Sequence, residues 1–93
     1  MAATNTGKRR VTFMCKANPG DEVRVAGSFN GWDPDATPLK DTKGDGHFKK
    51  TMYLPLGRHE YKFVVNGTWC IDSACPEWVH NDLGSLNSLR HVQ

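Results

Sequence analysis

The stretch Tyr61–Trp69, which reads YKFVVNGTW, contains the most informative turn in the sequence. An Asn-Gly dipeptide between two β-rich runs is the strongest short-range signal of a two-residue β-hairpin. Asn66 and Gly67 therefore predict a hairpin in which the residues before the turn pair with those after it. The predicted pairs are Val65 with Thr68, Val64 with Trp69, Phe63 with Cys70 and Lys62 with Ile71.

Side chains alternate between the two faces of a strand, so this register also sorts the hairpin residues by face. Lys62 and Trp69 fall on one face as diagonal neighbours, about 7–8 Å apart by strand geometry. A fully buried lysine is rare, so we expect this face to be open to solvent, although the hairpin alone would equally allow Trp69 to pack under a loop or another sheet. The opposite face, which we expect to be the core, carries Tyr61, Phe63, Val65, Thr68 and Cys70.

The rest of the chain shows the same alternation with period 2, which is typical of half-buried antiparallel strands. Apolar and polar residues alternate over residues 10–15 and 22–25, and Phe48, Met52 and Leu54 share one parity. Turn-forming sequences separate these runs at residues 18–21, 43–46, 55–57 and 66–67. Short strands with such turns between them predict an all-β fold, an immunoglobulin-like antiparallel β-sandwich.

The length of 93 residues fits one domain with a single hydrophobic core. Residues 1–8 are mostly small and polar, and we interpret them as a flexible N-terminal arm, with residues 9–93 as the folded module. Hydrophobic residues make up 38% and charged residues 24% of the chain, which is typical of a soluble domain rather than a membrane or fibrous protein. No signal-peptide core is visible, and no apolar run approaches the roughly 20 residues of a membrane-spanning helix.

Charge and cysteine content narrow the function classes further. The net charge is only +2, and the one tight basic group, residues 8–10, is better explained as a solvated strand entrance than as a nucleic-acid site. The odd set of Cys15, Cys70 and Cys75 does not suggest the disulfide framework of a secreted protein. We therefore expect an intracellular, cytoplasmic location, with no nucleic-acid partner and no membrane partner.

Three ordered motifs extend the argument beyond the hairpin: GSFNGWD at residues 27–33, YKFVVNGTW at 61–69 and LGSLNS at 83–88. With these motifs, the sequence resembles the family 48 carbohydrate-binding modules over about residues 9–92. One such motif could occur in any β-rich loop, so the resemblance rests on all three at compatible spacing. It implies a non-catalytic module that binds an α-1,4-linked glucan, glycogen or starch, and targets an attached or associated enzyme to it.

The resemblance also implies roles for single residues. Trp32 and Trp69 correspond to the sugar platform of the family, and Leu83 corresponds to a leucine that projects into the curve of the glucan. Lys62 and Asn87 correspond to residues that hydrogen-bond to sugar hydroxyls. These residue types suit a pyranose, because an indole covers its apolar C–H face and polar side chains reach its fringe of hydroxyls.

Trp78 goes beyond the family pattern. It lies in a predicted loop that leads to Leu83, within the sequence CPEWVH at residues 75–80. The sequence leaves two interpretations open: Trp78 either joins the carbohydrate-binding platform or anchors this loop on the sandwich.

The implied partners are an α-glucan and an enzyme, which could be a kinase complex, a branching or debranching enzyme, or a phosphatase. A second function also fits the fold. The chain could be an immunoglobulin-like protein-docking module of a kinase complex or glucan-modifying enzyme, with no functional sugar site, because one sandwich fold hosts many functions.

Catalysis and metal binding have little support in the sequence. Cys70, Cys75 and His80 match no tetrahedral zinc pattern and lack a fourth ligand. No nucleophile elbow or oxyanion motif accompanies the cysteines, serines and histidines. Asp33 and Asp35 flank a proline in a turn, which favours a role in the loop over one in glycoside hydrolysis. We therefore expect no enzyme activity, no metal and no cofactor.

Overall fold

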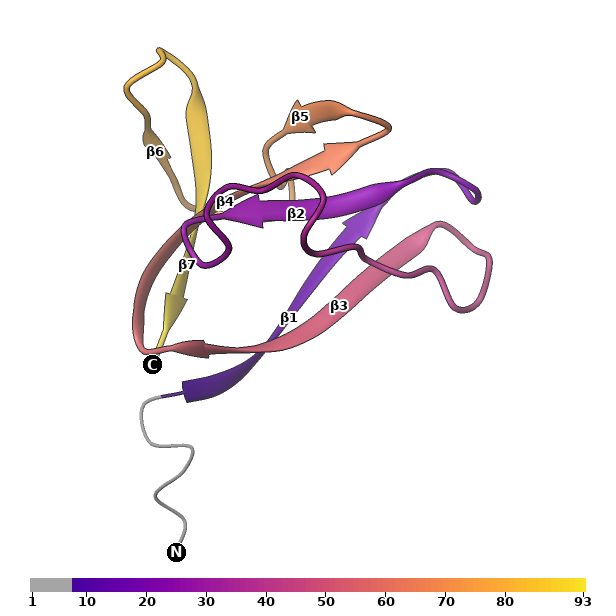
Figure 1. The fold of residues 1–93 in the computed structure, drawn as a ribbon, viewed down its shortest axis with the longest axis horizontal. Coiled ribbons are helices and arrows are strands. Elements are labelled where there is room, and N and C mark those ends of the chain that lie inside the picture. The colour runs from indigo at the N-terminus through magenta and orange to yellow at the C-terminus, as the bar shows by residue number, and fades with distance from the viewer. Residues whose placement is uncertain (1–7) are drawn as a thin grey trace, which may run out of the picture.

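The computed structural model describes residues 8–93, which fold into two antiparallel β-sheets (Figure 1). The strands are β1 (Lys8–Lys16), β2 (Val23–Gly27), β3 (His47–Pro55), β4 (Gly57–Val65), β5 (Thr68–Cys70), β6 (Trp78–His80) and β7 (Leu86–Val92). The smaller sheet contains β1 and β3. The larger sheet has the order β2-β4-β7-β6, with β5 also paired to β4. The predicted all-β sandwich is confirmed.

The predicted N-terminal arm lies almost entirely outside the described residues, because residues 1–7 are not part of the description. Lys8, which we had placed in the arm, is the first residue of β1 and lies opposite Pro55 of β3. Within residues 8–93, no helix is long and apolar enough to cross a membrane.

The hydrophobic core lies between the two sheets. Phe13 of β1 contacts Tyr61 of β4 edge to face, with ring centroids 4.9 Å apart, and Tyr61 meets Phe63 in the same way at 5.7 Å. Each of these rings is only 1% exposed. The predicted alternation is confirmed, because the inward positions of the neighbouring strands are also buried, namely Val11, Val23, Val25, Phe48 and Leu54.

The hairpin of β4 and β5 has the predicted register over all three residues of β5. Asn66 and Gly67 have φ angles of 50° and 83°, and two successive left-handed residues are what a type I′ turn requires. The side-chain oxygen of Asn66 accepts a hydrogen bond from the Glu22 N–H at 2.9 Å, and its amide donates to the Asp21 carboxylate at 3.0 Å. The turn is therefore tied to the chain that enters β2.

The end of this hairpin differs from the prediction. Because β5 ends at Cys70, Ile71 does not pair with Lys62. Thr68 and Cys70 are both exposed, although the predicted register puts them on the core face. The three-residue β5 pairs only with β4, and Cys70 at its end lines an open hollow together with Cys15 of β1.

The face of the hairpin that carries Lys62 is only partly open to solvent. Trp69 is 44% exposed, as this prediction requires, but Val64 on the same face is only 4% exposed. Arg24 and Trp69 are the residues directly opposite Val64 on its two neighbouring strands. Side chains of such cross-strand pairs lie in contact, so these two large neighbours shield the valine.

Substitutions at two adjacent residues of β1, the buried Phe13 and the exposed Met14, test the location of the core between the sheets. Phe13→Ala should lower the free energy of unfolding by about 3–5 kcal/mol, because it leaves a cavity between the sheets. The control Met14→Ala should change it by less than about 0.5 kcal/mol, since Met14 is 51% exposed. Urea unfolding followed by tryptophan fluorescence measures both values. Equal losses would contradict a core between β1 and β4.

Candidate functional site

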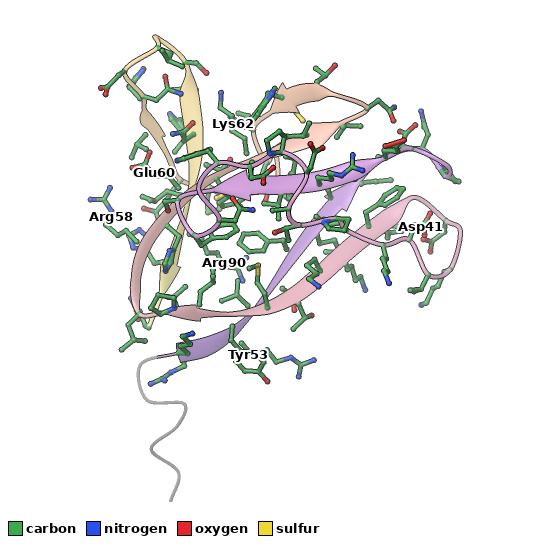
Figure 2. The ribbon with its side chains drawn as sticks, in the orientation of Figure 1. Asp41, Tyr53, Arg58, Glu60, Lys62 and Arg90 are labelled. Carbon is green, nitrogen blue, oxygen red and sulfur yellow. The ribbon has the colours of Figure 1, made fainter. Side chains whose placement is uncertain are left out.

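The candidate site lies where the partner of one edge of β4 changes from β7 to β5. The opposite edge of β4 pairs with β2 over residues 61–65. The other edge pairs with β7 over residues 57–61 and then with β5 over residues 63–65. Lys62 lies between these two pairings, where the β6–β7 and β4–β5 hairpins diverge (Figure 1). Figure 2 shows its side chain in the fork between the two hairpins.

A hollow of about 660 Å³ occupies this fork. It brings together the predicted platform residues, the predicted polar residues and the predicted leucine, and three further residues complete its lining. The lining consists of Trp32, Lys62, Trp69, Asn81, Asp82, Leu83, Ser85 and Asn87. Side chains from four separate segments of the chain therefore converge on one place.

The two tryptophans reach the hollow from opposite edges of β4. Trp69 belongs to β5 on one edge, whereas Trp32 lies in the loop that follows β2 on the other. Trp69 is 44% exposed and Trp32 is half-buried. Two large indole surfaces thus remain accessible around one concave surface.

Asn30 holds the loop that carries Trp32. Its side-chain oxygen accepts a hydrogen bond from the Gly27 N–H, and its amide donates to the Val25 carbonyl and to the Thr37 hydroxyl, each at 3.0 Å. The N–H of Trp32 donates to the Gly27 carbonyl at 2.9 Å. The asparagine of the GSFNGW motif is therefore a structural residue that fixes the loop.

The backbone of Trp32 lies in an unfavourable region. Its φ angle is 59°, and it follows Gly31 at 69°. A bulky residue with positive φ is an outlier, and the left-handed conformation costs about 1–2 kcal/mol. Such strain persists where surrounding contacts over-determine the local structure, and it gathers at functional positions. The indole of Trp32 lines the hollow from this left-handed position.

Lys62 and Asn87 provide the polar side of the hollow. The ammonium of Lys62 donates a hydrogen bond to the Ser85 hydroxyl at 2.6 Å. The amide nitrogen of Asn87, a residue only 6% exposed, donates to a carboxylate oxygen of Glu60 at 2.9 Å. An ammonium has three donors and a side-chain amide has two, so both groups keep hydrogen-bonding capacity for a ligand.

Leu83 lies at the tip of the β6–β7 hairpin and is 91% exposed. Asn81 shapes this tip, because its side-chain oxygen accepts hydrogen bonds from the N–H groups of Leu83 and Ser85 at 2.9 and 3.1 Å. Gly84 completes the turn with a φ angle of 76°. The hairpin thus holds out a large apolar side chain beside the hollow.

Trp78 does not line the hollow. It lies in β6, not in a loop as we had predicted, and it is 56% exposed. Its neighbour Val79 lies opposite Asn87 in the β6–β7 ladder. Because successive residues of a strand face opposite sides, Trp78 lies on the other face of the sheet from Asn87.

Asn81, Asp82 and Ser85 line the hollow but were not predicted as site residues from the sequence. Ser85 lies within the LGSLNS motif, so the sequence marks its position, but no sequence pattern predicts its contact with Lys62. Asn81 and Asp82 precede that motif and follow the three-residue β6, which is too short to show a periodic pattern. Only the hairpin geometry brings these residues to the hollow.

The cysteines near the smaller sheet offer little nucleophilic character. Burial, together with the nearby Cys70 and Asp72, raises the pKa of the Cys15 thiol to about 11. Partial burial and Asp72 also raise the pKa of Cys70 above its ordinary value. Both thiols are therefore protonated at neutral pH. Across residues 8–93, no three histidine, cysteine or acidic side chains gather as a metal site would require.

Exposed indoles beside fixed hydrogen-bonding groups suit a ligand that has an apolar face and a rim of hydroxyls, and sugars are such ligands. The β-sandwich and its hollow together define a carbohydrate-binding module.

Comparison with known proteins identifies the family. Residues 10–93 match the family described as the glycogen recognition site of AMP-activated protein kinase, and the chain belongs to this family. The resemblance inferred from the three sequence motifs is therefore confirmed.

Several similar proteins are named as subunits of AMP-activated protein kinase. Over 88 residues, the chain is 38% identical to 5'-AMP-activated protein kinase subunit beta-2 of Rattus norvegicus and of Homo sapiens. This match covers 95% of the chain but only 31% of each of those proteins, so the chain spans less than a third of their length. Subunit beta-1 of Sus scrofa is also 38% identical over 88 residues, which cover 95% of the chain and 68% of that sequence.

The left-handed backbone at Trp32 can be tested by comparing two substitutions at one position. Trp32→Gly should be more stable than Trp32→Ala by about 1 kcal/mol, because glycine adopts positive φ without steric cost. At Trp78, in β6, the order should reverse, since glycine weakens a strand. Thermal unfolding of the four variants measures both differences. An alanine variant at position 32 as stable as the glycine variant would show that Trp32 is unstrained.

Proposed function

We propose that this chain binds α-1,4-linked glucan, such as glycogen or starch, in the hollow between the β6–β7 and β4–β5 hairpins. The observation that carries the proposal is the convergence of Trp32 and Trp69 with Lys62 and Asn87 around one concave surface. Chain segments far apart in sequence meet there, and each contributes a residue type that suits a sugar.

In this proposal, sugar rings stack on the indoles of Trp32 and Trp69. Both side chains are large, and each has few rotatable bonds to immobilise. Because the two tryptophans approach from opposite edges of β4, the surface between them is concave. An α-1,4-glucan coils, so successive rings can follow such a surface, and Leu83 at the hairpin tip extends into the inner side of the curve.

Lys62 and Asn87 hydrogen-bond to sugar hydroxyls in the same proposal. The Ser85 hydroxyl occupies one donor of the Lys62 ammonium, and the remaining donors are available to a ligand. Asn87 lies on the adjacent strand, so the two groups can engage hydroxyls of neighbouring sugar rings. The apolar contacts favour association, and these polar contacts orient the chain of sugars.

We further propose that residues 9–93 act as a non-catalytic targeting module without a cofactor, inside the cell. The relatives are named as subunits of a kinase, which supports a kinase complex as the associated enzyme rather than a branching enzyme, a debranching enzyme or a phosphatase. Tethering a kinase to a glucan raises its effective concentration at that polymer without any new contact.

Substitution of the tryptophans tests the proposed site. In isothermal titration with maltoheptaose, Trp32→Ala and Trp69→Ala should each weaken binding by about 30-fold or more, because loss of a central aromatic anchor removes 2 kcal/mol or more. Trp78→Ala is the matched control and should bind as the unsubstituted chain does. Melting temperatures recorded in parallel should fall only modestly for Trp69→Ala, which uncovers Val64 but leaves no cavity between the two sheets.

Two results would contradict the proposal. A folded chain that gives no heat with millimolar maltoheptaose does not bind glucan, and the protein-docking function would then explain the sandwich fold better. A loss of about 3–5 kcal/mol of stability in Trp69→Ala would show that Trp69 is a core residue. Cellohexaose, a β-1,4-linked glucan, serves as the ligand control and should bind more weakly than maltoheptaose.

A further inference from the structure

A continuous chain of hydrogen bonds includes Asn81 and Asn87, two of the side chains that line the hollow. The Glu60 carboxylate accepts from the Asn87 amide nitrogen at 2.9 Å, and the Asn87 oxygen accepts from the Asn81 amide nitrogen at 3.0 Å. The Asn81 oxygen then accepts from the N–H groups of Leu83 and Ser85 at 2.9 and 3.1 Å. A charged group on β4 is thereby connected to the tip of the β6–β7 hairpin through two asparagines.

The groups at the two ends fix the orientation of both amides. An ionised carboxylate only accepts hydrogen bonds, so Asn87 must turn its nitrogen toward Glu60. Backbone N–H groups only donate, so Asn81 must turn its oxygen toward the hairpin tip. The remaining atoms, the Asn81 nitrogen and the Asn87 oxygen, then face each other as donor and acceptor. Neither amide can flip without losing a hydrogen bond.

We propose that Asn81 is a positioning residue of the sugar site, which holds the Asn87 amide and the Leu83 turn in one arrangement with Glu60 as its anchor. This inference rests on the proposed function, because the proposed role of Asn81 is to orient two sugar-binding residues, Asn87 and Leu83. The side-chain oxygen and one amide N–H of Asn81 are already hydrogen-bonded within the protein. It therefore acts through its neighbours rather than mainly through the sugar.

The fixed amide orientation defines what Asn87 offers to a ligand. One N–H of its nitrogen and one lone pair of its oxygen remain after the two internal hydrogen bonds. A sugar hydroxyl can donate and accept, so it can engage either group. An Asn87 side chain that is already held at both ends loses little conformational entropy when the sugar binds.

Asn81→Asp separates this role from a purely structural one. The aspartate keeps the oxygen that accepts from the Leu83 and Ser85 N–H groups, so the hairpin tip stays folded. It removes the donor to Asn87, whose amide then lies between two carboxylates and can satisfy only one of them through its nitrogen. Asn18→Asp is the matched control, because it makes the same chemical change at an exposed position outside the hollow.

Titration with maltoheptaose should show that Asn81→Asp binds about 3- to 10-fold more weakly, the fold-change expected for loss of one hydrogen bond. Asn18→Asp should bind as the unsubstituted chain does. In free protein, the side-chain ¹⁵N–¹H signals of Asn87 should shift and exchange faster with solvent in Asn81→Asp, while the backbone signals of Leu83 and Ser85 remain. A structural role alone would leave the Asn87 signals unchanged.

Rescue by a second substitution tests the connection through Asn87. In Asn81→Asp with Glu60→Gln, the Asn87 amide can flip, donate to the new aspartate and accept from the glutamine nitrogen. Affinity should therefore recover to within about 1.5-fold of the unsubstituted chain, whereas Glu60→Gln alone should change it little, because the glutamine oxygen still accepts from Asn87. Residues 60 and 81 would then be coupled by more than about twofold, as expected for members of one network.

The outcomes distinguish this inference from the proposed function. If the unsubstituted chain fails to bind maltoheptaose, the proposed function is wrong and the inference fails with it. If the chain binds, equal affinities of Asn81→Asp and the unsubstituted chain overturn the inference alone. Weaker binding of Asn81→Asp without any recovery in the double variant also overturns it, because Glu60 would then not be the anchor.

Discussion

The candidate site depends on one constraint, which is that two strands share a single edge of β4. The Asn66-Gly67 turn folds β5 back onto residues 63–65, so β7 can pair with that edge only as far as Tyr61. Lys62 is left between the two partners, and the hairpins on either side separate from this point. A two-residue turn therefore produces the hollow, because it limits where the next strand can pair.

Hydrogen bonds from small polar side chains hold the parts that surround the hollow. Asn30 fixes the loop of Trp32 through three bonds, and Asn81 fixes the turn of Leu83 through two bonds to its backbone N–H groups. Asparagine suits this role, because its side chain both donates and accepts and readily imitates a backbone turn. Loops that would otherwise be mobile can then present apolar side chains at defined positions, which favours binding with a small loss of entropy.

The sequence predicts the parts of the fold that are local. Alternation identified the buried faces of the strands, and the Asn-Gly turn gave the register that places Trp69 beside Lys62. The parts that depend on distant contacts escaped prediction. Cys70 is exposed because it lines an open hollow with Cys15, and Trp78 lies in a strand too short to show a period. The hydrogen bond between Asn87 and Glu60 joins the β6–β7 hairpin to β4 across 27 positions, a relation that no local pattern expresses.

The indole N–H signals of the three tryptophans provide the most direct test of the site. In a ¹H–¹⁵N spectrum recorded during titration with maltoheptaose, each tryptophan contributes one indole signal that reports on its own surroundings. We expect the signals of Trp32 and Trp69 to shift together along one binding curve while the signal of Trp78 stays in place. A titration that moves only Trp78, or that leaves Trp32 and Trp69 unchanged, would contradict a glucan site in the fork of the sheet.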